Sequence, residues 1–354
     1  MSNTPPPLVS VIIPAYNSAP FVAQAIESVL TQSLRELELI VIDDGSRDET
    51  LKVASTFRTD PRLTVRWHEG HLNRGVSYSR YLGVTTARGQ WIAFLDADDW
   101  FARDKLERQI DALSNWPKAL MCHTDAEVVN SEGAHCPHPY MFKMSDRSAC
   151  YSMPKDRSFL KHCNICHSST LVRSSIVKSI DFRIPSRFFE DWFLWVLVGE
   201  KGQYLYLPEK LTFYRWHPAS NTSALNQPTK MKFGLLEFYL SVLSRSCSER
   251  VAQQAAAHAR ATLDTLLQLL HTRESVQEEV DISSARKLLF AEATSFDLEL
   301  ARQQIDTLTA ENEDLNLQLR TIRSSRAWRL LQRCRTIMLT LKATRPAPGA
   351  TRGG

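Results

Sequence analysis

Short apolar runs alternate with amphipathic segments along the first hundred residues of the chain. Runs rich in β-branched and aromatic residues predict buried strands, at Leu8–Ile13, Glu38–Ile42, Leu63–Trp67 and Trp91–Leu95. Apolar residues at helical spacing predict helices between them, at Phe21–Gln32, Asp48–Phe57, Ser77–Ala87 and Arg103–Leu113. Strands and helices that alternate at this pace pair in parallel through right-handed crossovers. The pattern therefore predicts an α/β fold.

Polar residues follow each of these predicted strands. The four polar loops are Pro14–Asn17, Asp43–Ser46, Asn73–Gly75 and Asp96–Asp99. The carboxyl ends of parallel strands lie at one edge of a sheet, and open α/β sheets bind their ligands there. We therefore expect the four loops to converge on one ligand site.

The last of these loops carries three acids in four positions, Asp96, Asp98 and Asp99. Carboxylates this close repel one another unless a positive charge lies among them. Mg²⁺ or Mn²⁺ fits, because hard cations bind one or two carboxylates and complete their shell with water and phosphate oxygens. The alternative is a solvated acidic turn that caps the helix from Arg103 to Leu113.

The loop Asn73–Gly75 favours an anion instead. It lies beside a helix N-terminus, which carries partial positive charge, and Arg80 one turn into that helix could reach a diphosphate. The alternative for Arg80 is a surface ion pair. The chain has no glycine-rich phosphate loop and no dinucleotide fingerprint, which argues against those modes of nucleotide binding.

Four segments, in this order, resemble the nucleotide-sugar half of family 2 glycosyltransferases, which are inverting enzymes with a GT-A fold. They are V-S-V-I-I-P-A-Y-N from Val9, V-I-D-D-G-S from Val41, N-R-G-V-S-Y-S-R from Asn73 and W-I-A-F-L-D-A-D-D from Trp91. The resemblance implies a Rossmann-like, mostly parallel central sheet. One departure is Tyr81, where many relatives carry Asn, and it bears on the fine contacts of that helix.

The resemblance also implies roles for single residues. The implied donor-binding residues are Pro14, Ala15, Tyr16, Asn17, Asp44, Arg80 and Asp96, supported by Asn73 and Gly75. Among them, Asp44 would hydrogen-bond the base of a nucleotide-sugar donor. Asp96-Ala97-Asp98 would be the motif that binds Mg²⁺ or Mn²⁺, with Asp98 the direct ligand.

The next stretch carries weaker signals. Leu120–Glu132 predicts a strand and a turn, and His135–Tyr151, rich in Pro, His and Ser, predicts a loop over the acceptor side. His162–His167 holds two Cys and two His, a possible zinc site, but no second ligand pair follows at zinc-ribbon spacing. The resemblance instead places it in a core strand entering Ser168–Val172, with the cysteines as small hydrophobes.

Glu190 and Asp191 open a strongly apolar helix that runs to about Val198. Two acids in a first turn can simply compensate the helix dipole. The stretch also resembles the Glu-Asp motif of the same family, which implies that Asp191 is the catalytic base and that Glu190 supports it. The surrounding aromatic residues would raise the pKa of Asp191 toward the working pH and offer a platform for a sugar ring.

Tyr204–Leu207 predicts another strand, and Phe213–Pro218 matches the closing segment of the family. The match implies that His217 joins the metal or the diphosphate; the alternative is a structural histidine. The resemblance ends near Ser223, so we place the catalytic domain at residues 1–225.

The composition changes beyond residue 225. Residues 226–296 predict a helical region, in which Lys230–His271 forms two or three packed helices. A heptad follows at 297–325, through Leu298, Ala301, Ile305, Leu308, Asn312, Leu315, Leu319 and Ile322. A single Asn in an apolar seam favours a short parallel coiled coil, and with it a homodimer. The alternative is a long helix docked on the catalytic domain.

Residues 326–345 are basic, contain no acid, and interleave Trp328 with several leucines. A basic amphipathic tail suits an anionic membrane surface. A solvated charge run is the alternative, and nucleic acid is not indicated because no recognition fold accompanies the basic run. Residues 346–354 are predicted to be disordered.

The net charge, the N-terminal segment and the cysteines bear on where in the cell the protein lies. The net charge is +4 at pH 7, too weak to indicate a nucleic-acid partner. Met1–Pro7 lacks the apolar core of a signal peptide, and the seven cysteines are scattered, which predicts reduced thiols and a cytoplasmic protein, peripheral on the inner membrane face through its tail. No apolar run approaches the roughly 20 residues that span a bilayer.

These observations predict metal-dependent, inverting transfer of a sugar to a hydroxyl of a sugar or lipid-linked sugar, in the assembly of cell-surface polysaccharide or glycolipid. One alternative is a non-catalytic assembly protein that works through the coiled coil and the tail. A nucleotidyltransferase is another, but it would need a basic, glycine-rich triphosphate loop near the first strand, where Pro14–Asn17 stands.

Overall fold

The structure is a computed structural model that describes residues 6–136, 149–152, 159–183, 188–218, 228–246 and 248–271. The chain divides into two compact units, residues 1–280 and 281–354, and the second lies outside the described residues. The predicted coiled coil, basic tail and disordered end therefore lie outside them, as does most of the predicted acceptor-side loop.

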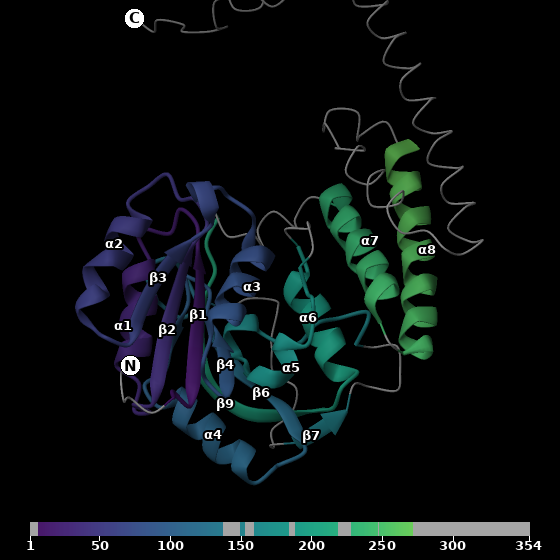
Figure 1. The fold of residues 1–354 in the computed structure, drawn as a ribbon. Coiled ribbons are helices and arrows are strands. Elements are labelled where there is room, and N and C mark those ends of the chain that lie inside the picture. The colour runs from purple at the N-terminus through teal and green to yellow at the C-terminus, as the bar shows by residue number, and fades with distance from the viewer. Residues whose placement is uncertain are drawn as a thin grey trace, which may run out of the picture. The chain divides into compact units, whose positions relative to one another are not determined.

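Four parallel strands form the first half of the sheet. The strands are β1 (Val9–Ala15), β2 (Leu37–Asp43), β3 (Leu63–Trp67) and β4 (Trp91–Phe94), in the spatial order β3-β2-β1-β4. Every residue of β1 and β2 is buried, because helices cover both faces (Figure 1). The predicted parallel pairing of these strands is confirmed.

The prediction that Pro14 and Ala15 lie in a loop is wrong. Both belong to β1, where they are opposite Ile42 and Asp43 of β2. A proline inside a sheet lacks a ladder donor and is tolerated where a flank is free. The pairing of β1 with β4 ends at Ile12, so Pro14 lies where only β2 remains beside it.

The second half makes the sheet mixed rather than mostly parallel. Strand β8 (Leu171–Arg173) runs antiparallel to both β4 and β6 (Ala119–Val129). The long β9 (Gln203–Arg215) is parallel to β6 and antiparallel to β5 (Trp100–Phe101) and β7 (Ala149–Ser152). The alternation of strand and helix that imposes parallel pairing ends after β4, so the crossover rule does not apply to these strands.

The predicted helices of the first half are confirmed to within a few residues. They are α1 (Val22–Leu30), α2 (Thr50–Thr56), α3 (Val76–Thr86) and α4 (Lys105–Ser114). Helix α3 lies very close to β1, since a Cβ on Gly83 would be 2.4 Å from Cγ2 of Ile12. This close packing fixes the α3 N-terminus beside the carboxyl ends of the strands.

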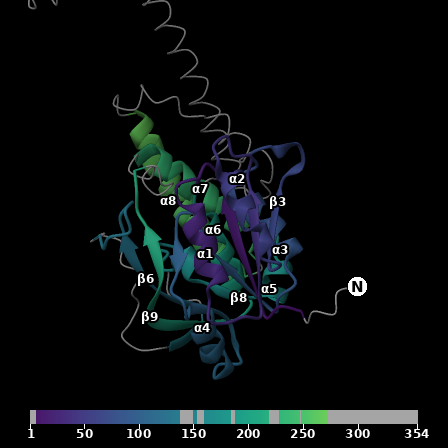
Figure 2. The same ribbon diagram turned by 90° about the vertical axis from the view of Figure 1, so that its left-hand side faces the viewer.

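Two short helices follow, α5 (Ser174–Lys178) and α6 (Glu190–Gly199), and then the antiparallel pair α7 (Pro228–Arg245) and α8 (Glu249–His271). Helices α7 and α8 lie side by side in both views (Figures 1 and 2). Helix α7 also packs on α6, where the rings of Phe238 and Trp192 stack with centroids 4.2 Å apart. The helical region thus supports the turn that carries Glu190 and Asp191.

Candidate active site

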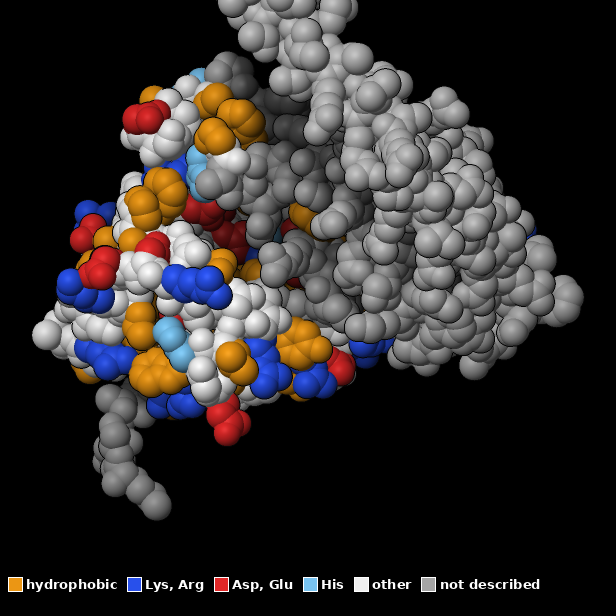
Figure 3. All heavy atoms as spheres, turned by 90° about the horizontal axis from the view of Figure 1, so that it is seen from above, with side chains coloured by type: hydrophobic (Ala, Val, Ile, Leu, Met, Phe, Trp, Pro, Cys, Tyr) orange, Lys and Arg blue, Asp and Glu red, His pale blue; other side chains and the backbone are white. Residues whose placement is uncertain are grey.

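The polar loops meet at the carboxyl ends of the parallel strands, as predicted. Seen from above, this face is hollowed, and acidic side chains gather inside the hollow (Figure 3). The loops after β1 and β2 are joined directly: the Asn17 amide donates to Oγ of Ser46 over 3.0 Å, and Oδ1 of Asn17 accepts from the Arg47 amide. Asn17 has a left-handed φ of 49°, which an asparagine tolerates better than most residues.

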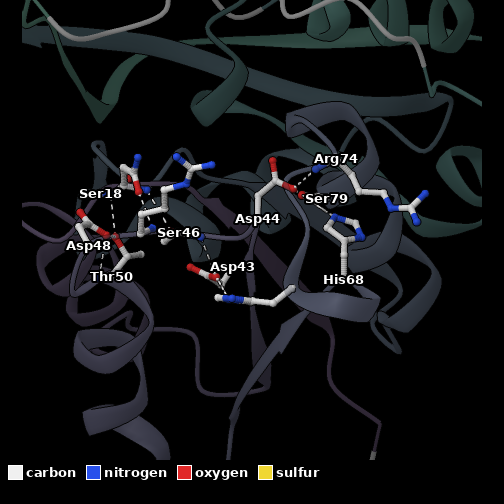
Figure 4. A network of polar contacts seen from close by, with 12 residues as sticks. Ser18, Asp43, Asp44, Ser46, Asp48, Thr50, His68, Arg74 and Ser79 are labelled. Carbon is white, nitrogen blue, oxygen red and sulfur yellow. Dashed lines mark hydrogen bonds and ion pairs between the residues drawn. The ribbon is translucent and has the colours of Figure 1, made fainter.

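Asp44, at the end of β2, holds the loop that precedes α3 (Figure 4). Its Oδ1 accepts a hydrogen bond from the Arg74 amide over 2.7 Å, and its Oδ2 accepts from the Gly75 amide over 2.9 Å. His68 lies alongside, with Nε2 2.9 Å from Oγ of Ser79 and 3.4 Å from Oδ1 of Asp44. Burial lowers the pKa of His68, although Asp44 opposes the shift. At neutral pH the imidazole is therefore uncharged.

Asp43, the last residue of β2, also holds neighbouring loops in place. Its buried carboxylate accepts from the Ser46 amide over 3.2 Å and contacts Nε2 of His71 at 2.6 Å. Gly45, between Asp44 and Ser46, has a φ of +73°, and a Cβ there would lie 2.7 Å from the His71 carbonyl oxygen. Only glycine fits this turn, so the loops after β2 and β3 are locked against each other.

The remaining predicted donor residues lie around this network. Pro14 and Ala15 are buried in β1, whereas Tyr16, Asn17 and Asn73 are exposed on the rim. Gly75 precedes α3 with a φ of +91°. The structure thus brings Tyr16, Asn17, Asp44, Asn73 and Gly75 to one edge.

The three acids of the acidic turn, residues 96–99, have separate partners. Asp99 is buried; its Oδ2 accepts from Oγ of Ser168 over 2.5 Å and its Oδ1 from the Arg215 amide over 2.8 Å. Burial, with Asp98 and Asp96 nearby, raises the pKa of Asp99. Asp98 is partly exposed, with Oδ2 3.1 Å from Nε2 of His217. Asp99 therefore anchors the turn, and Asp98 faces the site.

Asp96 pairs with Arg80, which also reaches Glu190 in the first turn of α6. The Arg80 guanidinium donates from Nη2 to Oδ1 of Asp96 and from Nη1 to Oε1 of Glu190, both over 2.6 Å. Arg80 is only 4% exposed, so this is a buried bridge and not the surface ion pair considered above. Although burial opposes its charge, Asp96 and Glu190 hold the pKa of Arg80 above its ordinary value. Contact between Arg80 and a diphosphate stays a prediction.

Glu190 and Asp191 form the first turn of α6, after Phe189 with a left-handed φ of 62°. A non-glycine residue in this region is strained, and such strain is concentrated at functional sites. Burial raises the pKa of Asp191, against the opposing field of Arg80. Burial likewise raises the pKa of Glu190 to about 7, opposed by Arg80 and assisted by Asp191. Oδ1 of Asp191 is 2.7 Å from the Trp192 amide, which donates to it.

The expectation of a sugar platform is wrong for the tryptophans of α6. Trp192 and Trp195 are buried, and Nε1 of Trp192 donates to the Phe159 carbonyl oxygen over 2.8 Å. Of the aromatic residues next to the acids, Phe188 and Phe189 are half-buried. The tryptophans act through packing, since they keep water from the buried side of the two acids.

The His162–His167 stretch contributes to the site through its end. His167 lies between the rings of Phe94 and Trp195, at centroid distances of 4.8 and 5.2 Å, and burial keeps its pKa low. Burial raises the pKa of the Cys163 and Cys166 thiols, as expected for small core side chains. A 3₁₀ turn, His167–Ser169, then presents Ser168 to the acidic turn.

Across the described ranges, no group of three His, Cys, Asp or Glu side chains is arranged to hold a metal ion. Asp98 and His217 nevertheless offer two suitable atoms. Adjacent ligands of an octahedral ion with bonds of about 2.1 Å are roughly 3 Å apart, which agrees with the 3.1 Å between Oδ2 of Asp98 and Nε2 of His217. The residues present therefore fit Mg²⁺ or Mn²⁺ if a ligand such as a diphosphate completes the shell.

Comparison with known proteins shows the family. The model of glycosyl transferase family 2 matches residues 10–180. An uncharacterized glycosyltransferase of Rickettsia typhi, RT0329, is 30% identical over 231 residues, which are 64% of this chain and 69% of that protein. The chain belongs to glycosyl transferase family 2.

Other relatives differ from this chain in length. The chain is 30% identical over 236 residues to an uncharacterized glycosyltransferase of Rickettsia felis, and this match covers 67% of the chain but 37% of that protein. The chain thus spans about a third of the length of the first relatives it matches. The Escherichia coli protein WfaP, a UDP-Glc:alpha-D-GlcNAc-diphosphoundecaprenol beta-1,3-glucosyltransferase, is 27% identical over 60% of this chain and 79% of its own.

Solved structures support a GT-A-like α/β fold for this family 2 domain. TarS residues 1–349 of S. aureus, in complex with UDP-GlcNAc, gives a TM-score of 0.56 at 19% identity over 79% of this chain and 78% of that one. The mannosyltransferase PcManGT of Pyrobaculum calidifontis, in complex with GDP-Man and Mn²⁺, gives 0.50 at 15% identity over 87% and 86%. At these identities the likeness concerns the fold alone.

The sequence did not point to two residues, Ser168 and Arg215, that hold the acids of the site in place. Ser168 accepts from the Asp96 amide over 3.1 Å and donates to Asp99, and Arg215 bonds Asp98 through Nε and Asp99 through its amide nitrogen. Ser168 lies within residues 10–180, which the family model matches, and Arg215 lies beyond them. The available signal for Arg215 was an arginine at the end of the strand, directly before the segment that holds His217.

Proposed function

We propose that this protein is an inverting glycosyltransferase that moves a sugar from a nucleotide-diphosphate donor to an acceptor hydroxyl. The observation that carries the proposal is the Arg80 bridge. It joins Asp96, on the donor side, to Glu190, which directly precedes the proposed base. Two motifs separated by about a hundred residues therefore belong to one site.

Asp191 is the base of this mechanism. A partly buried carboxylate with a raised pKa is a better proton acceptor near neutral pH than an exposed aspartate. Asp191 removes the proton of the acceptor hydroxyl, whose oxygen attacks the anomeric carbon from the face opposite the diphosphate. One displacement inverts that carbon and leaves the proton on Asp191.

On the donor side, Asp44 and the exposed Tyr16 face the nucleoside, and Asn73 and Gly75 lie at the α3 N-terminus. Asp98 and His217, assisted by Asp96, would hold Mg²⁺ or Mn²⁺, and this ion supplies positive charge to the leaving diphosphate when bound. The positive charge of Arg80, which pairs with Asp96, also stabilises the leaving diphosphate.

A lipid-linked sugar is the proposed acceptor class. WfaP, by its name, acts on a sugar linked to diphosphoundecaprenol, and that similarity supports the proposal. No described helix is long and apolar enough to cross a membrane. Membrane contact through residues 326–345 and a dimer through 297–325 remain proposals. Liposome flotation and sedimentation of the chain with and without residues 297–354 test them, and unchanged behaviour would exclude both.

The rival assembly protein and nucleotidyltransferase are separated from this proposal by turnover. We expect Asp191→Asn to lose about 10²–10⁴-fold in donor turnover, the usual contribution of a general base. Donor affinity by calorimetry should stay within about twofold, because Asp191 touches the acceptor. Asp181→Asn, an exposed acid ten residues earlier that pairs with Arg183, is the matched control and should behave as wild type.

Donor turnover is measured as release of the nucleoside diphosphate, with UDP-, GDP-, dTDP- and CDP-sugars tested in turn in the presence of Mn²⁺. Full turnover by Asp191→Asn would remove this residue from the mechanism. Absence of turnover for every donor would favour the assembly protein.

A further inference from the structure

Arg215, the last residue of β9, is a buried guanidinium with an unusual set of partners. It is 4% exposed, yet its side-chain donors all go to neutral oxygens. Nε donates to the Asp98 carbonyl oxygen over 2.8 Å, Nη2 donates to Oε1 of Gln24 over 2.6 Å, and Nη1 donates to the Ser131 carbonyl oxygen. A charge buried only to form an ion pair would meet a carboxylate; here the guanidinium links three separate segments.

Aromatic rings hold the guanidinium from two sides. Its carbon lies 4.7 Å from the ring centroid of Phe21 and 4.7 Å from that of Trp100. Phe21 also packs on the His217 ring, at a centroid distance of 5.0 Å. These ring contacts and the three hydrogen bonds together restrict the orientation of the guanidinium.

The consequence concerns Asp98. Arg215 holds Asp98 by its carbonyl oxygen and Asp99 by the Arg215 amide, which donates to Oδ1 of Asp99 over 2.8 Å. With the main chain held at both residues, the Asp98 carboxylate is directed to His217, two residues beyond Arg215 on the same segment. One residue therefore sets the separation of the two atoms that fit a divalent ion.

We propose that Arg215 is a positioning residue that sets Asp98 and His217 at the separation a divalent cation requires. The inference rests on the proposed function, since it assigns a task within that site. Residues that orient ligands without touching the ion commonly change metal affinity by about 10–100-fold when replaced.

The test measures Mn²⁺ binding to the full chain, with UDP and then GDP present, from the electron paramagnetic resonance signal of free Mn²⁺. Arg215→Met keeps the apolar stem and removes the hydrogen bonds, and we expect its Mn²⁺ dissociation constant to rise about 10–100-fold. Arg215→Lys keeps the charge but loses the planar fork, and should also bind Mn²⁺ more weakly. Turnover at saturating Mn²⁺ should recover in the lysine variant, which a merely structural role would not produce.

Arg62→Met is the matched control. Arg62 is also partly buried and joins segments, because it donates to both oxygens of Asp60 and to the Leu30 carbonyl oxygen. It lies at the opposite end of the parallel strands, just before β3, so its loss should leave Mn²⁺ affinity unchanged.

The outcomes separate this inference from the proposed function. Wild-type Mn²⁺ affinity in both Arg215 variants, with loss in Asp98→Ala, would overturn the role of Arg215 and leave the metal site standing. Wild-type affinity in Asp98→Ala would overturn the metal site and the inference together. If Arg215→Met does not fold, wild-type affinity in Arg215→Lys alone overturns the inference.

Discussion

The two sides of the proposed site, a donor side at Asp43 and Asp44 and an acceptor side at Glu190 and Asp191, use carboxylates in opposite ways. On the donor side, Asp43 and Asp44 accept hydrogen bonds from main-chain amides and so fix the shape of two loops. On the acceptor side, Glu190 is paired with a buried guanidinium, and burial raises its pKa and that of Asp191. The donor-side carboxylates therefore fix the positions of loops, whereas the surroundings of the acceptor-side carboxylates set their protonation.

This difference predicts different responses to substitution. Changes on the donor side should alter stability and donor affinity with little effect on the pH profile. Changes on the acceptor side should alter charge balance, and with it turnover and the pH dependence of stability. Arg80 joins the two sides, so its loss should affect both.

Arg80→Met should have the largest effect. It leaves Asp96 and Glu190 without their counter-charge, and removing one partner of a buried pair costs about 3–5 kcal/mol of unfolding free energy. We expect turnover to fall by about 10²–10³-fold, the usual loss of one electrostatic group. Urea unfolding and initial rates measure the two effects. Arg88→Met removes a guanidinium that is 68% exposed and pairs with the buried Glu38. It should cost no more than about 1 kcal/mol, because Ser10 and the Arg88 amide still donate to Glu38.

The double variant Arg80→Met/Glu190→Gln sharpens this test. Removing the Glu190 charge should restore part of the lost stability without restoring turnover. If the double variant is no more stable than Arg80→Met, charge imbalance is not the cause.

Glu190→Gln tests the proton on the acceptor side. With a folded-state pKa of about 7, native Glu190 keeps a proton that the unfolded chain has lost above its ordinary pKa. This residue therefore stabilises the fold fully at low pH, and the contribution is lost as pH rises to about 7. A shift of this size corresponds to about 3 kcal/mol.

The measurement is urea unfolding at pH 4.5 and pH 8. Relative to wild type, Glu190→Gln should gain stability at the higher pH. Glu127→Gln is the control of opposite sign, because the hydrogen bond from Lys210 lowers the pKa of Glu127, so that its contribution is lost as pH falls. Equal slopes in wild type and Glu190→Gln would contradict the assignment.

Gly45→Ala tests the geometry of the donor side and should have the smallest effect on turnover. A left-handed non-glycine residue costs on the order of 1 kcal/mol or more, and here the Cβ also meets the His71 carbonyl oxygen at 2.7 Å. Gly70→Ala provides the comparison, since Gly70 has a similar φ of +69° but its nearest neighbour would be 3.6 Å away. The difference in melting temperature isolates the clash, and equal values would show that the loops are not locked.

The first half of the fold could be predicted because its information is local. Strand β3 has the predicted bounds, Leu63–Trp67, and apolar runs predict the other parallel strands. The loops that follow β1 and β2 each contact the loop of the next strand along the chain. The exposure of α6 could not be predicted. That helix is apolar on all sides, so periodicity does not distinguish the buried Trp192 from a residue on the surface.

The partners of the charged residues could not be predicted for a related reason. Arg80 meets Glu190 across 110 positions, and Arg215 meets Asp98 across 117. Nothing local in the sequence selects one distant acid over another. The acids of the candidate site were found from their loops, whereas the residues that set their charge and orientation required the folded sheet.

The anomeric configuration of the sugar released from an α-linked donor tests the central claim most directly. Water can take the place of the acceptor, and proton NMR during the first minutes of donor hydrolysis distinguishes the two anomers before they interconvert. A single displacement with Asp191 as the base predicts that the β anomer appears first. Initial release of the α anomer would contradict it.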